Sequence, residues 1–445
     1  MLWNHPIFKG TIILTLSGLL SRFMGFFYRV FLSRTIGAEG VGLYQLVFPV
    51  YILACSLTVS GIQTAVSRLV SSRIASPASG SIHSILLTGI LFSVGLSVPV
   101  TVLLFFCASP IAVCYLKNSA TADLLRLIAL ALPFSAFHTC ADGYYLGTRN
   151  TIIPAIRQLL EQSVRFLLLL PLYYHILPNS IPLTPHTAVL ILVLEELFAA
   201  LFSFIALLIS SGIFHTTHIL QTSRHFYASV LRSDSRQLLS IALPVTGNRT
   251  AVCVLQSLEA SLLPACLCRY GYTSVQALRI YGILTGMSLP MILFPTAVTT
   301  SLCAMLLPSV SAAWTACSFS HVRNLIKKSI LSCLAVGIIF SLSFLFFGKS
   351  MTSLLFQNEL AGCYIQTFSF ICPLLYLNPV LFSILNGLGK SSAIFFYNMT
   401  NLILRLMFLL FAVPYYGISG YFAGLFLSQL FCCLLSLRAL EHTLF

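Results

Sequence analysis

Residues 10–32 read GTIILTLSGLLSRFMGFFYRVFL, an apolar stretch with two arginines inside it. About 20 apolar residues form a helix long enough to cross a bilayer. The polar and small residues of this stretch follow one another at spacings of 4, 3, 4, 3 and 4, which place them along one stripe of a helix. They are Thr11, Thr15, Gly18, Arg22, Gly25 and Arg29. A guanidinium in lipid costs several kcal/mol, so we expect the stripe to face a polar interior, with snorkelling as the alternative for Arg29.

The whole chain has the composition of this stretch. Its 445 residues are 58% hydrophobic and 8% charged, whereas soluble domains carry about 25% charged residues. We therefore predict an all-α integral membrane protein with about 12 transmembrane helices. The apolar runs lie at 10–32, 41–67, 81–107, 121–147, 151–177, 185–212, 237–264, 277–307, 322–348, 361–388, 391–414 and 417–440.

Three landmarks recur along the chain at nearly constant offsets of 240 or 241 residues. They are Pro49 and Pro290, Pro133 and Pro373, and Arg165 and Arg405. Such repeats are how many transporters are built. Six spans per copy is an even number, so the two copies share one orientation. We predict an N-terminal six-helix lobe at 1–212, a cytoplasmic linker at 213–236 and a C-terminal six-helix lobe at 237–445.

The net charge of +14 is unevenly distributed. With the N-terminus in the cytoplasm, 13 of the 24 lysines and arginines fall in inside segments, six outside and five within spans. This positive-inside bias predicts a multi-pass protein of the cell membrane with both termini cytoplasmic. It argues for membrane lipids as partners and against nucleic acid. The 14 cysteines and 10 histidines are scattered without metal-ligand spacing, so we expect no metal and no cofactor.

Two later spans also carry arginines at helical spacing. In the fifth, Glu161 and Arg165 are four residues apart and could form a structural ion pair. In the eleventh, Asn401 and Arg405 have the same spacing, but no carboxylate lies four residues from the arginine. This difference favours a use for Arg405 beyond local pairing.

The seventh span carries Asn248 and Arg249, with Glu259 on the same face as Arg249. Arginine is always charged and binds phosphate through two parallel hydrogen bonds. We therefore expect an anionic, phosphate-bearing substrate. The candidate substrate-binding residues are Arg22, Arg29, Arg165, Asn248, Arg249 and Arg405. The candidates for a coupling ion are Asp142, Glu161 and Glu259, and structural pairing is an equally good interpretation of these acids.

Residues 9–70, and the stretch YGILTGMSLPMILFPTAVTTSLCAMLLPSVSAA at 281–313, resemble the stage V sporulation protein B group of polysaccharide-biosynthesis transporters. The resemblance implies a MATE-like fold, with two six-helix lobes around a central cavity. It also implies kinship with lipid II flippases, in which first-helix arginines engage the lipid diphosphate. Arg22, in its S-R-x-x-G-F setting, matches that motif, while Arg29 matches the sporulation group only.

The leading hypothesis is therefore a flippase, not an enzyme, for a polyprenyl-diphosphate-linked saccharide of the cell wall, spore cortex or surface polysaccharide. Alternating access would be coupled to protons, sodium or the membrane potential. One alternative is a cation-coupled multidrug exporter, for which interior carboxylates should outnumber arginines. Others are a membrane enzyme, which should need a large outside loop, or a scaffold that binds lipid-linked saccharides without moving them.

Overall fold

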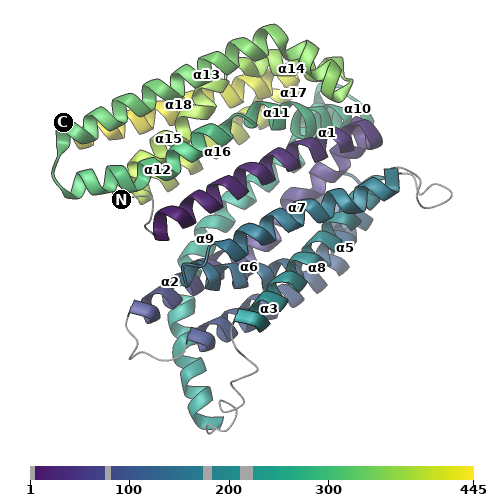
Figure 1. Cartoon of the computed structure of the whole chain (residues 1–445). Helices are drawn as coiled ribbons and strands as arrows, with labels where there is room; N and C mark the ends of the chain where they lie inside the picture. Colours follow the sequence, from purple (N-terminus) through teal and green to yellow (C-terminus); the bar gives the residue numbers. More distant parts are fainter. Residues whose placement is uncertain (1–5, 76–81, 174–182, 211–223, 445) are drawn as a thin grey trace. The chain divides into compact units, whose positions relative to one another are not determined.

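The computed structural model describes residues 6–75, 82–173, 183–210 and 224–444, and every regular element within them is helical (Figure 1). A helix satisfies its backbone hydrogen bonds within its own segment, which lipid demands of any spanning structure except a closed barrel. The predicted all-α class is confirmed. Residues 213–223 of the predicted linker lie outside the described residues.

The described chain divides into two compact units. Unit 1 comprises Met1–Gly25 and Leu46–Ser257, and unit 2 comprises Phe26–Gln45 and Leu258–Phe445. Two helices, α1 (Pro6–Cys55) and α9 (Arg224–Tyr270), therefore contribute residues to both units. The lobe boundaries at 212 and 237 stay a prediction.

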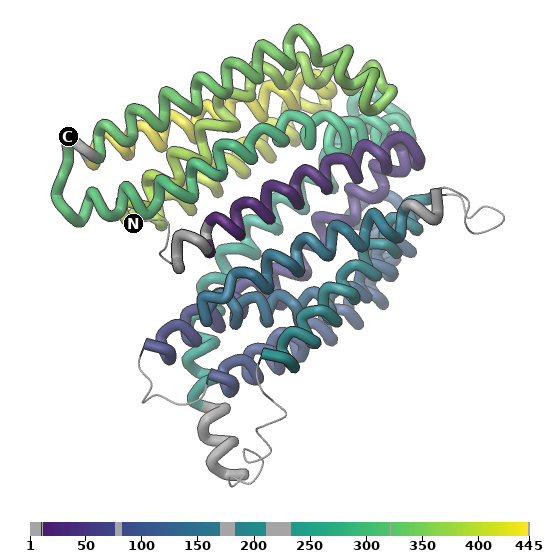
Figure 2. Tube along the Cα trace, in the orientation of Figure 1, coloured from purple at the N-terminus to yellow at the C-terminus, as the bar shows by residue number. Residues whose placement is uncertain are grey.

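Unit 1 contains the two ends of α1, the first part of α9 and the helices between them, whose order can be followed along the trace in Figure 2. The intervening elements are the π-helical turn η2 (Ser56–Ser60), α2 (Gly61–Ala75), α3 (Ile82–Phe106), α4 (Ala108–Pro110), the π-helical turn η4 (Ile111–Tyr115), α5 (Thr121–Ala129), α6 (Leu132–Gly147), α7 (Ile152–Tyr173) and α8 (Pro185–Ser210).

Unit 2 contains the middle of α1, the end of α9 and all the helices that follow. These are α10 (Ser274–Gly282), the π-helical turn η7 (Ile283–Ser288), α11 (Leu289–Leu293), α12 (Thr296–Thr315), α13 (Phe319–Phe356), α14 (Glu359–Ser369), α15 (Cys372–Gly387), α16 (Ser391–Phe411), α17 (Val413–Tyr416) and α18 (Ile418–Leu444).

In the described part, eight helices are long and apolar enough to cross a membrane, or up to ten if each of two bent pairs is one span. The difference from the predicted 12 has two physical sources. The first of the eight, Ile12–Ala75, is 64 residues long and contains two predicted spans, broken where Gly37 adopts φ 71° and ψ 176°. The helix α7 is not among the eight, because Arg157, Glu161 and Arg165 make it more charged than the others.

The two bent pairs lie at equivalent places of the repeat. Helices α5 and α6 meet at 43°, and α14 and α15 meet at 57°. In each case the second helix has a proline in its first turn, Pro133 in α6 and Pro373 in α15. Proline is tolerated there because the first helical N–H groups have no partner within the helix. The recurring prolines thus mark a bend present in both units.

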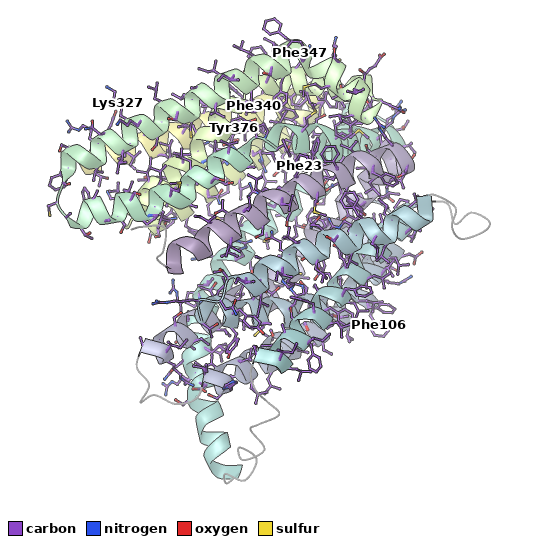
Figure 3. The ribbon with its side chains drawn as sticks, viewed as in Figure 1. Phe23, Phe106, Lys327, Phe340, Phe347 and Tyr376 are labelled. Atoms are coloured by element: carbon purple, nitrogen blue, oxygen red, sulfur yellow. The ribbon has the colours of Figure 1, made fainter. Side chains whose placement is uncertain are left out.

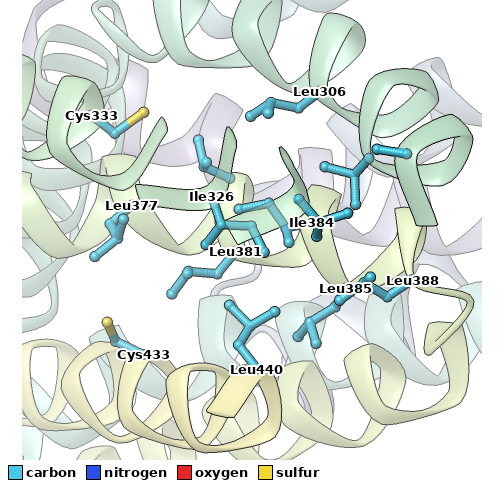
Figure 4. Close-up of a cluster of buried hydrophobic side chains, with 14 residues drawn as sticks. Leu306, Ile326, Cys333, Leu377, Leu381, Ile384, Leu385, Leu388, Cys433 and Leu440 are labelled. Atoms are coloured by element: carbon cyan, nitrogen blue, oxygen red, sulfur yellow. The ribbon is translucent and has the colours of Figure 1, made fainter. Parts of the chain in front are cut away.

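Equivalent glycines end the bent helices and pack closely against a neighbouring helix. A Cβ on Gly147 would lie 2.8 Å from Cβ of Val70 in α2, and a Cβ on Gly387 would lie 3.0 Å from Cβ of Val310 in α12. Val70 and Val310 are themselves 240 residues apart. Each valine belongs to the apolar core of its unit; Figure 4 shows the core of unit 2, where Leu306, Ile384 and Leu388 cluster.

Large apolar side chains also cover much of the outer surface, as expected for helices that face lipid. In Figure 3, Phe106 of α3 and Phe347 of α13 point away from the helices, and they are 76% and 62% exposed. Inside unit 2, by contrast, the ring of Phe340 packs edge-on against Tyr376, with centroids 6.3 Å apart. The hydroxyl of Tyr376 donates to the carbonyl oxygen of Ile292 at 2.7 Å.

Candidate functional site

Helix α7 places a buried arginine between two carboxylates of unit 1. The Nε atom of Arg157 donates to Oδ2 of Asp142 in α6 at 2.9 Å, and its Nη1 atom donates to Oε2 of Glu161 at 2.6 Å. The Arg157 side chain is only 12% exposed. Asp142 and Glu161, two of the candidates for a coupling ion, are therefore brought together by a shared guanidinium.

Two turns further along α7, Arg165 donates through Nε and Nη2 to both carboxylate oxygens of Glu195 in α8. The structure thus shows Arg165 with Glu195 and Glu161 with Arg157, whereas the sequence suggested that Glu161 and Arg165 could pair. Glu161 lies four residues from Arg157 and from Arg165, so helix geometry permits either partner. The carboxylate of Glu195, only 1% exposed, bonds to Arg165, and Glu161 pairs with Arg157.

The next residue of α8 belongs to a separate buried group. Oε2 of Glu196 lies 2.5 Å from Nε2 of His138 in α6, and the hydroxyl of Tyr51 in α1 donates to Oε1 of Glu196 at 3.0 Å. All three side chains are buried. Neither Tyr51 nor His138 was expected from the sequence to have a role, although each is a polar group inside an apolar run and so needs a partner.

Unit 2 holds an ion pair of its own. Nη2 of Arg405 in α16 donates to Oε2 of Glu259 in α9, and the hydroxyl of Tyr421 in α18 donates to Oε1 at 2.9 Å. The carboxylate that the sequence around Arg405 lacks is therefore supplied by another helix. Within the described residues, Nε of Arg405 and Oδ1 of Asn401 are buried without a hydrogen-bond partner.

A neutral polar pair occupies the place in unit 2 that corresponds to His138. Asn378 of α15 lies 240 residues after His138 and is buried. Its Nδ2 atom donates to the side-chain Oε1 of Gln429 in α18 at 2.6 Å and to the carbonyl oxygen of the same residue at 3.1 Å. Neither side chain of this pair can gain or lose a proton near neutral pH.

The other predicted substrate-binding residues are exposed. In unit 1 these are Arg22 of α1 and Asn248 and Arg249 of α9, and in unit 2 it is Arg29 of α1. A Cβ on Gly18, one turn before Arg22, would meet nothing within 4 Å, and one on Gly25 would lie 3.6 Å from Oε1 of Gln162 in α7. The side chain of Thr11 lies outside what the structure describes.

The charges of unit 1 segregate by burial. The buried and half-buried charged groups of α6, α7 and α8 comprise four carboxylates and two arginines, namely Asp142, Glu161, Glu195, Glu196, Arg157 and Arg165. The exposed charged side chains at the predicted binding positions are both arginines, Arg22 and Arg249. The excess of cations expected from the sequence is therefore found among the exposed groups only, because the buried arginines have carboxylate partners.

Two further observations concern metal binding and the remaining buried ion pair of unit 1. Among the described residues, no group of three or more His, Cys, Asp or Glu side chains could hold a metal ion. Within the predicted linker at 213–236, Asp234 of α9 is buried and pairs with the Arg73 guanidinium of α2, and Ser84 Oγ of α3 donates to Oδ2 of the same carboxylate at 2.7 Å. Through Asp234, α9 therefore contacts α2 and α3 of unit 1, and the sequence did not predict this contact.

Comparisons with known proteins agree with this architecture. Residues 7–314 match the family model described as polysaccharide biosynthesis protein. Stage V sporulation protein B of Bacillus subtilis (strain 168) is 28% identical over 421 residues, which are 94% of this chain and 80% of that protein. The lipid II flippase MurJ of the same bacterium is 26% identical over 182 residues, or 39% of this chain and 34% of MurJ.

A solved structure of a multidrug resistance MATE family transporter of the MOP superfamily, in its inward-facing conformation, also matches. The TM-score is 0.69 at 13% sequence identity, with 98% of each chain covered. The MATE-like fold predicted for this chain is thereby confirmed. The resemblance inferred from residues 9–70 and 281–313 is confirmed as well.

Proposed function

Since the chain belongs to the polysaccharide biosynthesis protein family, we propose that it moves a polyprenyl-diphosphate-linked saccharide across the cell membrane by alternating access. Two of its relatives, a sporulation protein and a lipid II flippase, favour a precursor of the cell wall or the spore cortex. The substrate is anionic and amphipathic: the diphosphate and sugars enter a polar cavity, and the prenyl chain stays in lipid.

One observation carries this proposal: Arg22 and Arg249 are exposed in two membrane-length helices of unit 1. Placing an arginine within a membrane costs free energy. Among the described residues, Arg249 is in none of the ion pairs with a carboxylate that could offset this cost. A diphosphate offers the paired oxygen acceptors that a guanidinium fits best. The open surface at Gly18 leaves room for a bulky headgroup beside Arg22.

The six predicted binding residues then divide into two groups. Arg22, Arg29, Asn248 and Arg249 are exposed and serve as contacts for the diphosphate and sugars. Arg165 and Arg405 hold buried carboxylates and serve to fix helices in their own units. We keep the six-helix lobes at 1–212 and 237–445 and the cytoplasmic position of both termini as parts of the proposal.

Reconstitution of the purified chain into vesicles with fluorescent lipid II tests the proposal. We expect transfer of the headgroup between leaflets by the wild type and a loss of at least about tenfold with Arg22→Ala or Arg249→Ala, the effect of about 1.4 kcal/mol in substrate binding. Arg126→Ala, which alters an exposed arginine paired with Asp123, is the matched control and should transfer normally. Wild-type transfer rates in both Arg22→Ala and Arg249→Ala would show that neither arginine makes the proposed contact with the substrate.

The acidic surplus in α6, α7 and α8 favours one competing function, export of organic cations by the same fold. That function predicts transport of a cationic dye such as ethidium and no transfer of lipid II. A scaffold predicts binding of lipid II without transfer. The same vesicles loaded with either probe separate the three functions.

A further inference from the structure

We propose that unit 1 contains a proton-binding site formed by His138 and Glu196, and that proton uptake there is the coupling step of transport. The coupling part rests on the proposed function, whereas proton binding does not. None of the three residues that the sequence favoured for a coupling ion belongs to this site. Those residues are held by arginines: Asp142 and Glu161 by Arg157, and Glu259 by Arg405.

The geometry is that of one shared proton. The 2.5 Å separation between Nε2 of His138 and Oε2 of Glu196 requires a hydrogen between the two atoms, which the imidazole or the carboxyl group can carry. The other ring nitrogen of His138 lies 3.4 Å from Oγ1 of Thr139. Histidine is the side chain whose unperturbed pKa places its charge change between about pH 5 and 8.

Both oxygens of Glu196 are already engaged: Oε1 accepts a hydrogen bond from the Tyr51 hydroxyl, and Oε2 shares a hydrogen with Nε2 of His138. A bound Na⁺ or Ca²⁺ would need several oxygen ligands directed at it, and here the two nearest groups present hydrogens to the carboxylate. The site is therefore suited to a proton rather than to a metal cation.

The charged groups around His138 and Glu196 carry a net negative charge, which a bound proton would reduce. Arg157 acts electrostatically on Glu196, and Glu196 and Glu161 act on Glu195, so these groups form one interacting set. Arg157 and Arg165 neutralise two of the four carboxylates in α6, α7 and α8. A proton held by His138 neutralises a third. Cys55 also lies close to Tyr51 and Glu196, and as a neutral thiol it does not alter this balance.

Unit 2 supplies an internal comparison. The position equivalent to His138 is Asn378, which bonds to Gln429 of α18, just as His138 bonds to Glu196 of α8. Both pairs join the same two helices of the repeat, because α15 follows the bend at Pro373 as α6 follows the bend at Pro133. A neutral amide pair therefore suffices to hold these helices together. The histidine and carboxylate of unit 1 add the ability to take up and release a proton.

The site also connects to segments that can change shape. Tyr51 follows Pro49 in α1 and precedes the π-helical turn η2, and His138 lies in the helix that begins at the bend near Pro133. Prolines and π-helical turns are where spanning helices bend. When His138 is neutral, the carboxylate of Glu196 has no compensating charge within this pair, so the strength of its hydrogen bonds to α1 and α6 depends on the protonation state.

The test replaces the pair of unit 1 by that of unit 2, with His138→Asn and Glu196→Gln combined. Proton uptake by purified protein in lipid nanodiscs, without any lipid-linked saccharide, is measured between pH 8 and pH 5 (about the titration range of histidine). We expect the double variant to take up about one proton fewer than the wild type. His186→Asn, which removes an exposed histidine, calibrates the loss of one titrating imidazole. Uptake equal to that of the wild type in the double variant would overturn the site.

Coupling is measured in vesicles containing fluorescent lipid II under an imposed pH difference. With one proton per cycle, a difference of one pH unit should shift the final transbilayer ratio of the lipid about tenfold in the wild type and leave it unchanged in the double variant. A shift that persists in the double variant would overturn the coupling role. Normal proton uptake with no lipid transfer in the wild type would instead refute the proposed function and leave the site standing. Should the double variant not fold, Glu196→Gln alone, which keeps side-chain length and hydrogen bonding, replaces it.

Discussion

The two units share a backbone plan but differ in the chemistry placed on it. Each has a bend that is followed by a helix with proline in its first turn, and each closes that helix with a glycine against an equivalent valine. On this common frame, unit 1 carries His138 with Glu196 and unit 2 carries Asn378 with Gln429. Backbone geometry recurs where packing requires it, whereas the polar pair at the same place differs in chemistry between the units.

The arginines at equivalent positions show the same divergence. Arg165 takes its carboxylate from α8, the next helix in the chain, and Arg405 takes its carboxylate from α9, far earlier in the chain. The two ion pairs therefore restrain different helices in the two units. Four sets of variants test these differences between the two units.

The largest effect is expected from removing the carboxylate partners. Glu259→Gln should lower the free energy of unfolding by about 3–5 kcal/mol, because it leaves the buried Arg405 charged and uncompensated. Glu195→Gln should cost less, since Glu161 lies one turn from Arg165 and can pair with it instead. Denaturant titration of the purified protein in detergent measures both. A larger loss with Glu195→Gln would contradict the proposed difference between the units.

Each unit has a tyrosine whose hydroxyl donates to a buried carboxylate: Tyr421 donates to Glu259, and Tyr51 donates to Glu196. Removing one hydroxyl deletes a hydrogen bond to a charged acceptor, worth about 1.5–3 kcal/mol. We expect Tyr421→Phe and Tyr51→Phe to destabilise by similar amounts in the same titration. Only Tyr51→Phe should also alter proton uptake between pH 8 and pH 5 (about the histidine range), and an equal change with Tyr421→Phe would show that the titrating group is not confined to unit 1.

The glycines that end the bent helices should respond unequally to a methyl group. A Cβ at Gly147 would lie 2.9 Å from the carbonyl oxygen of Ser67, and one at Gly387 would lie 3.1 Å from that of Leu307. Overpacking costs about 1–3 kcal/mol, so we expect Gly147→Ala to fall at the upper end of this range and Gly387→Ala at the lower end. Thermal unfolding of both variants, followed by tyrosine fluorescence, ranks them. The reverse order would show that the α2 side yields more readily than the α12 side.

The smallest effect is expected at the exposed pair of Arg126 and Asp123, whose charged atoms are 2.8 Å apart. Both side chains are well solvated, so Arg126→Ala should change stability by less than about 1 kcal/mol. This variant sets the baseline against which losses at the buried pairs are judged. A loss as large as that of Glu259→Gln would mean that detergent, rather than burial, determines the measured values.

The sequence predicts the backbone of this molecule better than its polar contacts. Most membrane-length apolar runs, and the recurring Pro133 and Pro373, correspond to observed helices and bends, because these are local or periodic properties. The predicted span at 277–307 is instead divided into α10, η7, α11 and the first part of α12.

Ion pairs are not set by such local or periodic properties. Glu161 has an arginine four residues away on each side, and sequence alone cannot choose between them. The partners of Arg165 and Arg405 lie 30 and 146 residues away, on helices whose neighbours only tertiary structure defines.

The site around Glu196 could be predicted only in part from the sequence. Both glutamates at 195 and 196 interrupt an apolar run, which signals that each needs a partner. His138 carries a weaker signal: its counterpart at an offset of 240 is another polar residue, Asn378, inside an apolar helix. Assigning His138 to Glu196, and Glu195 to Arg165, needs the spatial neighbours that the structure provides.

The division of α1 and α9 between the units has a consequence for attempts to dissect the molecule. A cut within 213–223 would strip the N-terminal fragment of the α9 segment ending at Ser257, including the Asp234 that meets Arg73, and would strip the C-terminal fragment of Phe26–Gln45. Neither piece would carry a complete set of packing partners. Fragment complementation should therefore succeed only when both halves are made together, because each unit takes residues from both sides of the cut.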